Sequence, residues 1–375
     1  MSCLAAALRA QAGTEMLERR LYLHLDWLLF GAIVCLSMIG VAMIYSTTGA
    51  WRLPTTQLYA IVIGSIAFVI CLTVDYRALT DKSHFIYLGL IGLLIYVLVF
   101  GTSAGGARRW ISLGAFNLQP SEFAKVGVAL VLATFFGENR RGAPTTGDLL
   151  IAGLLAGIPL ILIAREPDLG TAVTLIPIYL GIAYVAGMRL RIIGILAVIA
   201  IVTVPIAWNY ALKPYQKSRV ETFLDPSQDP KGAGYQQIQA QITVGSGGLT
   251  GKGYRKGTQG QLRFLPVAHN DFIFSALAEE QGFVGVLFVL SLYLIVIWRS
   301  LEAARLAKDR LGVYLVMGLM SSFTFQVIYN ITMSAGLAPV KGLTLPLLSY
   351  GGSSMIATLA SFGLILNVRM RRFTN

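Results

Sequence analysis

The sequence predicts an all-α integral membrane protein that spans the bilayer about ten times. Of its 375 residues, 55% are hydrophobic and only 13% are charged, and its mean hydropathy is +0.68. A soluble domain carries about 25% charged residues, so this chain has too little polar surface to coat a globule of its size. The composition therefore excludes a soluble protein and a disordered chain.

Ten segments are apolar enough to cross a membrane, which takes about 20 residues. The fourth begins at Pro120, and only residues 165–168 separate the fifth from the sixth, which predicts a tight hairpin. Pro346, Gly351 and Gly352 give the last segment an irregular start. The ten segments are 26–46, 56–74, 84–100, 120–137, 147–164, 169–187, 191–210, 272–298, 312–336 and 346–368.

The distribution of Lys and Arg predicts the orientation of these helices. With both termini in the cytoplasm, the inside segments carry far more Lys and Arg than the short outside loops, as the positive-inside rule requires. Residues 211–271, between helices seven and eight, then form one large extracytoplasmic loop within a single domain, 1–375. The net charge of +12 is typical of basic loops on a membrane protein and does not indicate a nucleic-acid partner.

The large loop is rich in glycine and has a net positive charge. Nine glycines fall within residues 231–260. Cations and a closely approachable backbone suit an anionic ligand, but a flexible solvated loop fits the same composition equally well. Tyr235, Ile238 and Ile242 recur at helical spacing and predict an amphipathic helix at the interface or against the bundle.

Carboxylates near the start of helix eight are candidates for function, because charge inside a membrane is costly. Asp271 could cap the helix, but Asn270 could do so too, and the carboxylate faces a cationic loop, which favours a functional role. Glu279 and Glu280 lie about 12 Å deeper and point about 100° apart, which fits structural pairing slightly better than chemistry.

Other charged residues are predicted near the same outer face. Glu122 and Lys125 are spaced i, i+3 and can pair, and we expect the pair to line an outward-facing cavity. Asp168 fits stabilisation of a helix N-terminus and a functional role equally well. Arg108 and Arg109 precede Trp110 and could either grip phosphate or anchor at lipid headgroups.

These groups suggest a chemistry. The chain shows one well-placed carboxylate and several cations but no Ser/His/Asp or Cys/His set, and its three histidines are far apart in the sequence. An enzyme on the outer face has no ATP, so its substrate must arrive activated, as a sugar linked to a polyprenyl diphosphate does. Diphosphate leaves without protonation, so one carboxylate acting as general base suffices. Cations or a divalent metal would stabilise the leaving group.

Seven ordered stretches carry a resemblance to a known family. They are Ala107–Trp110, Gln119–Lys125, Glu166–Thr171, Arg219–Tyr235, Gly245–Gly253, Phe264–Glu280 and Pro346–Ser353. Over nearly its whole length the chain resembles the SEDS family (shape, elongation, division and sporulation). The resemblance implies a peptidoglycan glycosyltransferase that polymerises lipid II on the outer face of the bacterial plasma membrane. The large loop is similar to the elongation-specific branch, whereas Lys341–Pro346 is closer to the division-specific branch.

The resemblance also implies roles for individual residues and partners. The family's essential carboxylate falls on Asp271, preceded here by Asn270 instead of the usual Thr. The expected supporting residues of the cavity are Glu122, Lys125, Asp168, Glu279 and Glu280; those of the diphosphate site are Arg108, Arg109, Arg219 and Lys252; and those of a substrate groove or its framework are Pro346, Ser349, Tyr350 and Gly351. A divalent metal, Mg²⁺ or Mn²⁺, is expected without identified ligands.

The expected partners are a class B penicillin-binding protein that cross-links the strands, lipid II, other proteins of the elongation complex, and membrane lipid. Two hypotheses from other functional classes stay open: a flippase for lipid-linked precursors, and a scaffold without catalysis. A transporter should line a path through both halves of the membrane, whereas the charged residues here cluster near the outer face.

Overall fold

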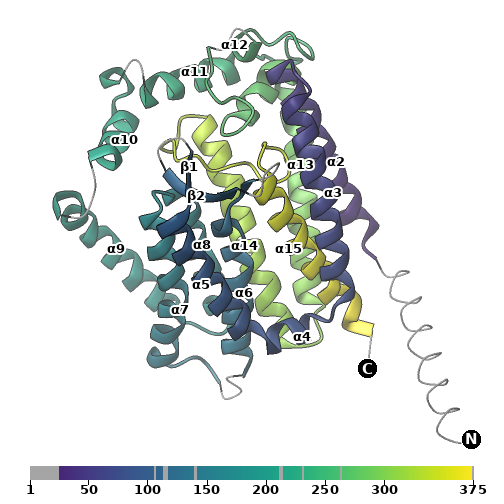
Figure 1. Ribbon diagram of the computed structural model, residues 1–375, viewed down its shortest axis with the longest axis vertical. Helices are drawn as coiled ribbons and strands as arrows, with labels where there is room; N and C mark the ends of the chain where they lie inside the picture. The colour runs from purple at the N-terminus through teal and green to yellow at the C-terminus, as the bar shows by residue number, and fades with distance from the viewer. Residues whose placement is uncertain are drawn as a thin grey trace, which may run out of the picture.

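The computed structural model describes residues 25–104, 107–112, 117–138, 142–210, 214–229, 232–261 and 264–373. Long helices within these ranges match the ten predicted spans (Figure 1). They are α2 (Trp27–Thr48), α3 (Arg52–Thr73), α5 (Ser83–Phe100), α6 (Pro120–Glu138), α7 (Thr146–Arg165), α8 (Leu169–Val185), α9 (Leu190–Tyr210), α13 (Ile273–Arg305), α14 (Arg310–Ser334) and α15 (Gly352–Met370).

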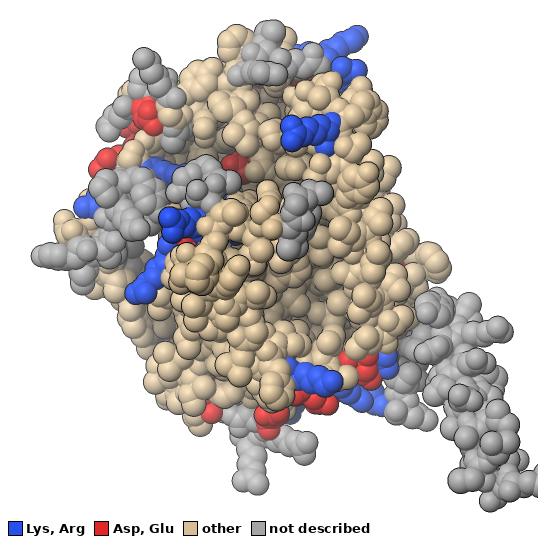
Figure 2. All heavy atoms as spheres, viewed as in Figure 1, with Lys and Arg blue, Asp and Glu red and all other residues tan. Residues whose placement is uncertain are grey.

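The chain is a mostly helical, multi-span membrane protein. Eight of the described helices are long and apolar enough to cross a membrane, and α8 and the first part of α9 are shorter apolar helices. Charged side chains gather toward two ends of the molecule and leave a broad uncharged belt between them (Figure 2). The N-terminal residues 1–24, which we expected in the cytoplasm, lie outside the described ranges.

Helix α15 forms the centre of the bundle. Of its most apolar window, 94% is buried inside the molecule, against 28% for α3, so protein surrounds α15 where lipid would face α3. The two helices pack closely because Gly363 has no side chain: a Cβ there would lie 2.9 Å from the Cβ of Cys71. Helix α6 is also largely buried, and its first turn contains Glu122, one of the predicted site residues.

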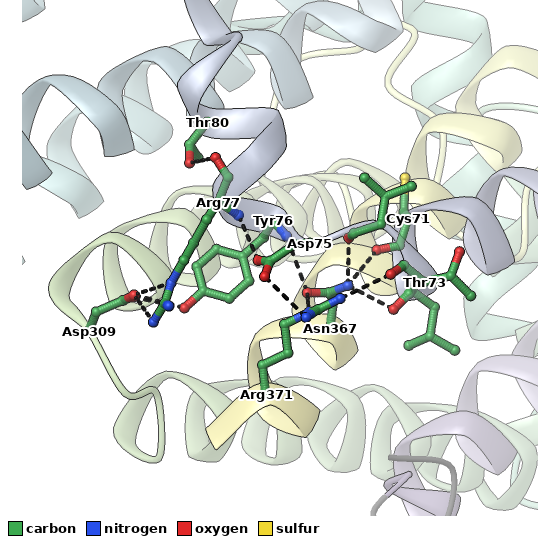
Figure 3. Close-up of polar contacts among 11 residues, drawn as sticks. Cys71, Thr73, Asp75, Tyr76, Arg77, Thr80, Asp309, Asn367 and Arg371 are labelled. Carbon is green, nitrogen blue, oxygen red and sulfur yellow. Dashed lines mark hydrogen bonds and ion pairs between the residues drawn. The ribbon is translucent and has the colours of Figure 1, made fainter. Parts of the chain in front are cut away.

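A polar network ties the helices together at one end of the bundle, which we call the α4 end after the short helix α4 (Tyr76–Asp81) (Figure 3). Asn367 donates to three carbonyls at the end of α3, at 2.7 to 3.1 Å, and so satisfies groups that a helix terminus leaves unpaired. Tyr76 and Arg77 both contact Asp309, the N-cap of α14. The ends of α3, α4, α14 and α15 are thereby fixed to one another.

The opposite end, which we call the loop end, carries a small sheet that the sequence did not predict. It consists of β1 (Thr102–Ala104), β2 (Ala107–Ser112) and β3 (Asn117–Leu118), antiparallel in that order. The all-α prediction therefore needs this correction: strands this short have no clear alternation of polar and apolar residues by which to find them.

The described part of the large loop is mostly helical. It contains α10 (Pro214–Leu224), the 3₁₀ turn η1 (Pro226–Gln228), α11 (Ala233–Gly245) and α12 (Thr258–Gln261), which follow one another around the loop end (Figure 1). Helix α11 confirms the predicted amphipathic helix, and of the two placements left open its isoleucines fit the one at the interface. Ile238 and Ile242 are exposed, whereas Gln237, Ala240 and Thr243 face the protein.

Helix α13 is longer than predicted and is broken at Gly282. This residue has φ +65°, which glycine adopts without strain. The backbone of the glycine-rich segment 248–253 pairs with the groups that the break frees. Lys252 N–H and Gly253 N–H donate to the carbonyls of Glu279 and Glu280, at 3.0 and 2.9 Å, and Phe283 N–H donates to Gly248 O at 2.9 Å. The loop is therefore bonded to the helix rather than freely solvated.

Candidate active site

A cavity of about 420 Å³ opens at the loop end of the bundle. Its wall combines strand β2, the N-terminal ends of α6, α8 and α15, and the backbone of residues 342–344. The polar residues that line it include Arg109, Gln119, Glu122, Asp168, Asn270 and Tyr350. Segments far apart in the sequence thus meet around one polar space, as an enzyme site requires.

Asp271 lies beside this cavity, at the turn that precedes α13. Asn330 of α14 donates to the backbone carbonyls of Asp271 and Leu343, at 2.9 and 2.7 Å, and so holds the two segments together. A Cβ placed on the cavity-wall residue Gly342 would lie 3.6 Å from Asp271 Oδ2. Helix α13 has Phe272 as its N-cap residue and no capping side chain, so the structure does not use Asp271 as a cap.

The electrostatic surroundings of Asp271 suit a general base. Burial raises the pKa of its carboxyl group to about 6, although the positive charges of Arg109 and Arg219 lower it. The carboxylate is thus ionised at neutral pH but is more basic than an exposed aspartate. A base with a pKa near the working pH is the efficient choice for removing a proton.

Arg108 and Arg109, the two predicted arginines of strand β2, have different surroundings, because successive side chains of a strand point to opposite faces. Arg109 lines the cavity, and its Nη1 lies 3.9 Å from Asp168 Oδ1. Arg108 is exposed and is not part of the cavity wall. The prediction that both bind diphosphate is therefore supported by the geometry for Arg109 only.

Asp168 both caps α8 and faces the cavity, so its two predicted roles coexist. Its carboxylate accepts from Thr171 N–H at 3.2 Å and from Gln119 Nε2 at 2.7 Å. Glu122 lines the same cavity and pairs with Lys125 at 2.7 Å, as expected. Both residues of this pair are buried. The cavity wall therefore includes one carboxylate of a buried ion pair.

The segment from Pro346 to Gly351 forms a turn, and α15 begins only at Gly352, later than predicted. Ser349 Oγ donates to Asn270 O at 2.6 Å, and Tyr350 N–H donates to His269 O at 3.0 Å. The predicted groove residues therefore hold the segment that carries Asp271. Only Tyr350 and Gly351 also line the cavity. Pro346 O accepts from a tyrosine of α13 at 2.6 Å, which fixes the turn to the bundle.

Three other predicted site residues serve the loop instead of the cavity. Glu279 is 1% exposed and accepts from Lys252 Nζ at 2.7 Å and from the N–H groups of Thr258 and Gln259. Glu280 accepts from Ser46 Oγ of α2 at 2.5 Å and from Arg255 N–H of the loop at 3.2 Å. Lys252, Glu279 and Glu280 are not part of the cavity wall. The Lys252 ammonium group is instead paired with Glu279.

The sequence analysis did not single out some polar residues that line the cavity or lie next to residues that do. Gln119 and Ser121 flank Pro120 and both hydrogen-bond Asp168 Oδ2; polar residues at the start of an apolar helix were the available signal. Glu166 was quoted only within a motif. It is 1% exposed, and both of its carboxylate oxygens lack a partner in the described part of the chain. Burial, and then the charge of Asp168, raise the pKa of Glu166 to about 8.

The expected divalent metal is not supported by the donor set. The described residues contain no group of three or more His, Cys, Asp or Glu side chains that could hold a metal ion. The charged groups that act on Asp271 are the cations Arg109 and Arg219, which repel a metal. The described residues do not fit a metal ion held by the protein alone, and the expected Mg²⁺ or Mn²⁺ stays a prediction.

Comparisons with known proteins agree with this geometry. The model of the family described as cell cycle proteins and named for FtsW, RodA and SpoVE matches residues 19–373. The peptidoglycan glycosyltransferase MrdB of Escherichia coli K12 is 38% identical over 93% of this chain and 94% of its own length, and RodA of Treponema pallidum is 31% identical over 92% and 98%. The probable peptidoglycan glycosyltransferase FtsW of Thiomicrospira cyclica is 35% identical over 92% and 91%.

Solved structures of similar sequence share the fold of this chain. A chain from a study of how a peptidoglycan synthase complex coordinates polymerization and crosslinking is 32% identical, with a TM-score of 0.82 over 94% of this chain and 99% of its own. The rod shape determining protein RodA of Thermus thermophilus gives a TM-score of 0.70 at 29% identity, over 94% and 98%. The chain therefore belongs to the family of FtsW, RodA and SpoVE, which is the SEDS family that its motifs indicated.

Proposed function

We propose that this protein is a peptidoglycan glycosyltransferase that polymerises lipid II into glycan strands for cell elongation. The observation that carries the proposal is the half-buried Asp271, with a raised pKa, beside a cavity lined by Arg109. Relatives named as peptidoglycan glycosyltransferases cover nearly the whole chain and support this activity. The FtsW relative, at 35% identity, falls between MrdB at 38% and RodA of Treponema pallidum at 31%, so the elongation role is supported by the match to MrdB and by the solved structure of RodA.

The reaction follows from the chemistry of these groups. Asp271 accepts the proton of the acceptor's sugar hydroxyl while the oxygen bonds to the anomeric carbon of the donor. The bond from that carbon to the diphosphate breaks, and both electrons leave with the diphosphate. Arg109 and Arg219 stabilise the negative charge that develops. Asn330 and Ser349 keep Asp271 in place through the backbone, so that the base is positioned before substrate arrives.

The loop end is proposed to face the outside of the bacterial plasma membrane. The distribution of Lys and Arg supports this orientation. The proposed partner is a class B penicillin-binding protein, because the structure with TM-score 0.82 comes from a complex that coordinates polymerization with crosslinking. Other elongation proteins and membrane lipid complete the set of proposed contacts.

Polymerisation of lipid II by the purified protein, with and without the partner, tests the proposal. Asp271→Asn should abolish polymer formation while folding and partner binding persist. Asp81→Asn, the same chemical change at an exposed site on the α4 end, should leave the rate unchanged. Polymer from Asp271→Asn would remove this carboxylate from the mechanism. Absence of polymer from the wild type with its partner would favour a transporter.

A further inference from the structure

Lys341 is a cation next to the active site that the sequence analysis did not include among the site residues. It is half-buried and precedes Gly342, the cavity-wall residue that faces the Asp271 carboxylate. Its Nζ lies 5.8 Å from the centre of the Tyr329 ring, so the ammonium group makes a cation–π contact with α14.

A second cation is held beside it. Arg219 of α10 donates from Nη1 to Val340 O at 3.1 Å, one residue before Lys341. Neither Lys341 nor Arg219 has a carboxylate within 4 Å among the described residues. Burial, and then the charge of Arg219, lower the pKa of Lys341. The two positive charges repel each other, and a bound anion would relieve this repulsion.

The chemistry of the reaction indicates which anion belongs here. The hydroxyl that Asp271 deprotonates attacks the anomeric carbon of the donor, and the donor's diphosphate is bonded to that same carbon. That diphosphate therefore lies within the reach of about one sugar ring from Asp271. The acceptor's own diphosphate is at the far end of its sugars. Cations beside Gly342 are thus placed for the donor's leaving group.

We propose that Lys341 binds the diphosphate of the donor lipid together with Arg219 and stabilises its charge as the bond to the anomeric carbon breaks. This inference rests on the proposed function. It also explains why the donor set does not fit a metal held by the protein: the chain's own cations meet the charge of the leaving group. The proton still goes to Asp271, and the electron pair leaves with the diphosphate.

Binding of farnesyl diphosphate tests the proposal without turnover. The full-length protein in neutral-lipid nanodiscs is titrated with farnesyl diphosphate and, separately, with farnesyl monophosphate, both in EDTA. Lys341→Gln should bind the diphosphate about tenfold or more weakly, because it loses a charge-assisted contact, and should discriminate less between the two ligands. Lys341→Arg should bind nearly as the wild type does. Lys256→Gln, at an exposed lysine of the same loop end, is the matched control.

The outcomes separate this inference from the proposed function. Unchanged diphosphate binding in Lys341→Gln, or wild-type binding that requires added Mg²⁺, would overturn it. If Lys341→Gln does not fold, Lys341→Met, which keeps an unbranched side chain of similar length, decides in the same assay. With lipid II, a fall in kcat supports stabilisation of the leaving group, whereas a rise in KM alone would mean that Lys341 contributes equally to ground-state and transition-state binding and would refute its role in bond breaking. If Lys341→Gln binds the diphosphate more weakly but the wild type makes no polymer, the diphosphate site is supported and the proposed enzymatic function is not.

Discussion

Replacing Glu279 by Gln should release the glycine-rich segment from α13 and destabilise the loop end. The carboxylate is 1% exposed and accepts from Lys252 Nζ at 2.7 Å, Thr258 N–H at 2.9 Å and Gln259 N–H at 3.2 Å. Removing one partner of a buried ion pair costs about 3–5 kcal/mol, because the other charge is left without compensation. Lys252 is about one-third exposed, so water screens part of this loss, and we expect the lower end of that range.

Trypsin provides the assay, because Arg255 and Lys256 are exposed between the bonded parts of the segment. Glu279→Gln should be cleaved there at least tenfold faster than the wild type at equal protease, and its unfolding temperature in detergent should fall. Glu138→Gln, the same chemical change at an exposed carboxylate at the end of α6, should change neither. Equal cleavage rates in Glu279→Gln and the wild type would refute the view that this carboxylate anchors the loop.

Three further predictions concern the active site and its surroundings. The polymerisation rate should fall as the pH drops through about 6, because Asp271 must be deprotonated; a flat profile from pH 5 to 8 would contradict this. Gly342→Ala should lower the rate more than tenfold and cost about 1–2 kcal/mol, since φ is +68° and the new methyl group contacts Asp271; Gly89→Ala, in open space, is the control. Glu166→Gln should be more stable than the wild type by a margin that grows between pH 4.5 and about 8, at about 1.4 kcal/mol per pH unit. The reason is that the wild-type fold must keep this carboxyl protonated while the unfolded chain ionises it. A difference in unfolding temperature that is equal at pH 5 and pH 8 would refute it.

The helices were predictable because a membrane span leaves a strong signal in a single sequence. Ten apolar segments were expected, and described helices lie over them, eight of which are long and apolar enough to cross a membrane. The errors occur where tertiary contacts decide the ends. Pro346 was included in the last helix, but the turn up to Gly351 is held by Ser349 and Tyr350 against the segment before Asp271, so the helix begins at Gly352.

The candidate site was predicted in part. Asp271, Glu122 and Asp168 were recognisable because a carboxylate near a span needs a reason to be there. The separation of Arg109 from Arg108 could not be foreseen without knowing that they lie on a strand. For α11 the apolar pattern left two placements open, and only the structure decides between them: Gln237, Ala240 and Thr243 face the protein, while Ile238 and Ile242 are exposed, as at an interface.

The break at Gly282 has a mechanical consequence. Asp271 and the loop anchors Glu279 and Glu280 all precede it, whereas the long apolar part of α13 follows it. A membrane of changing thickness tilts the helices that span it. The loop backbone is bonded to α13 on both sides of the break, since Lys252 N–H donates to Glu279 O and Phe283 N–H donates to Gly248 O. Tilt of the part of α13 that follows Gly282 therefore pulls on the glycine-rich segment, and the thickness of the surrounding lipid acts on the loop end through these bonds.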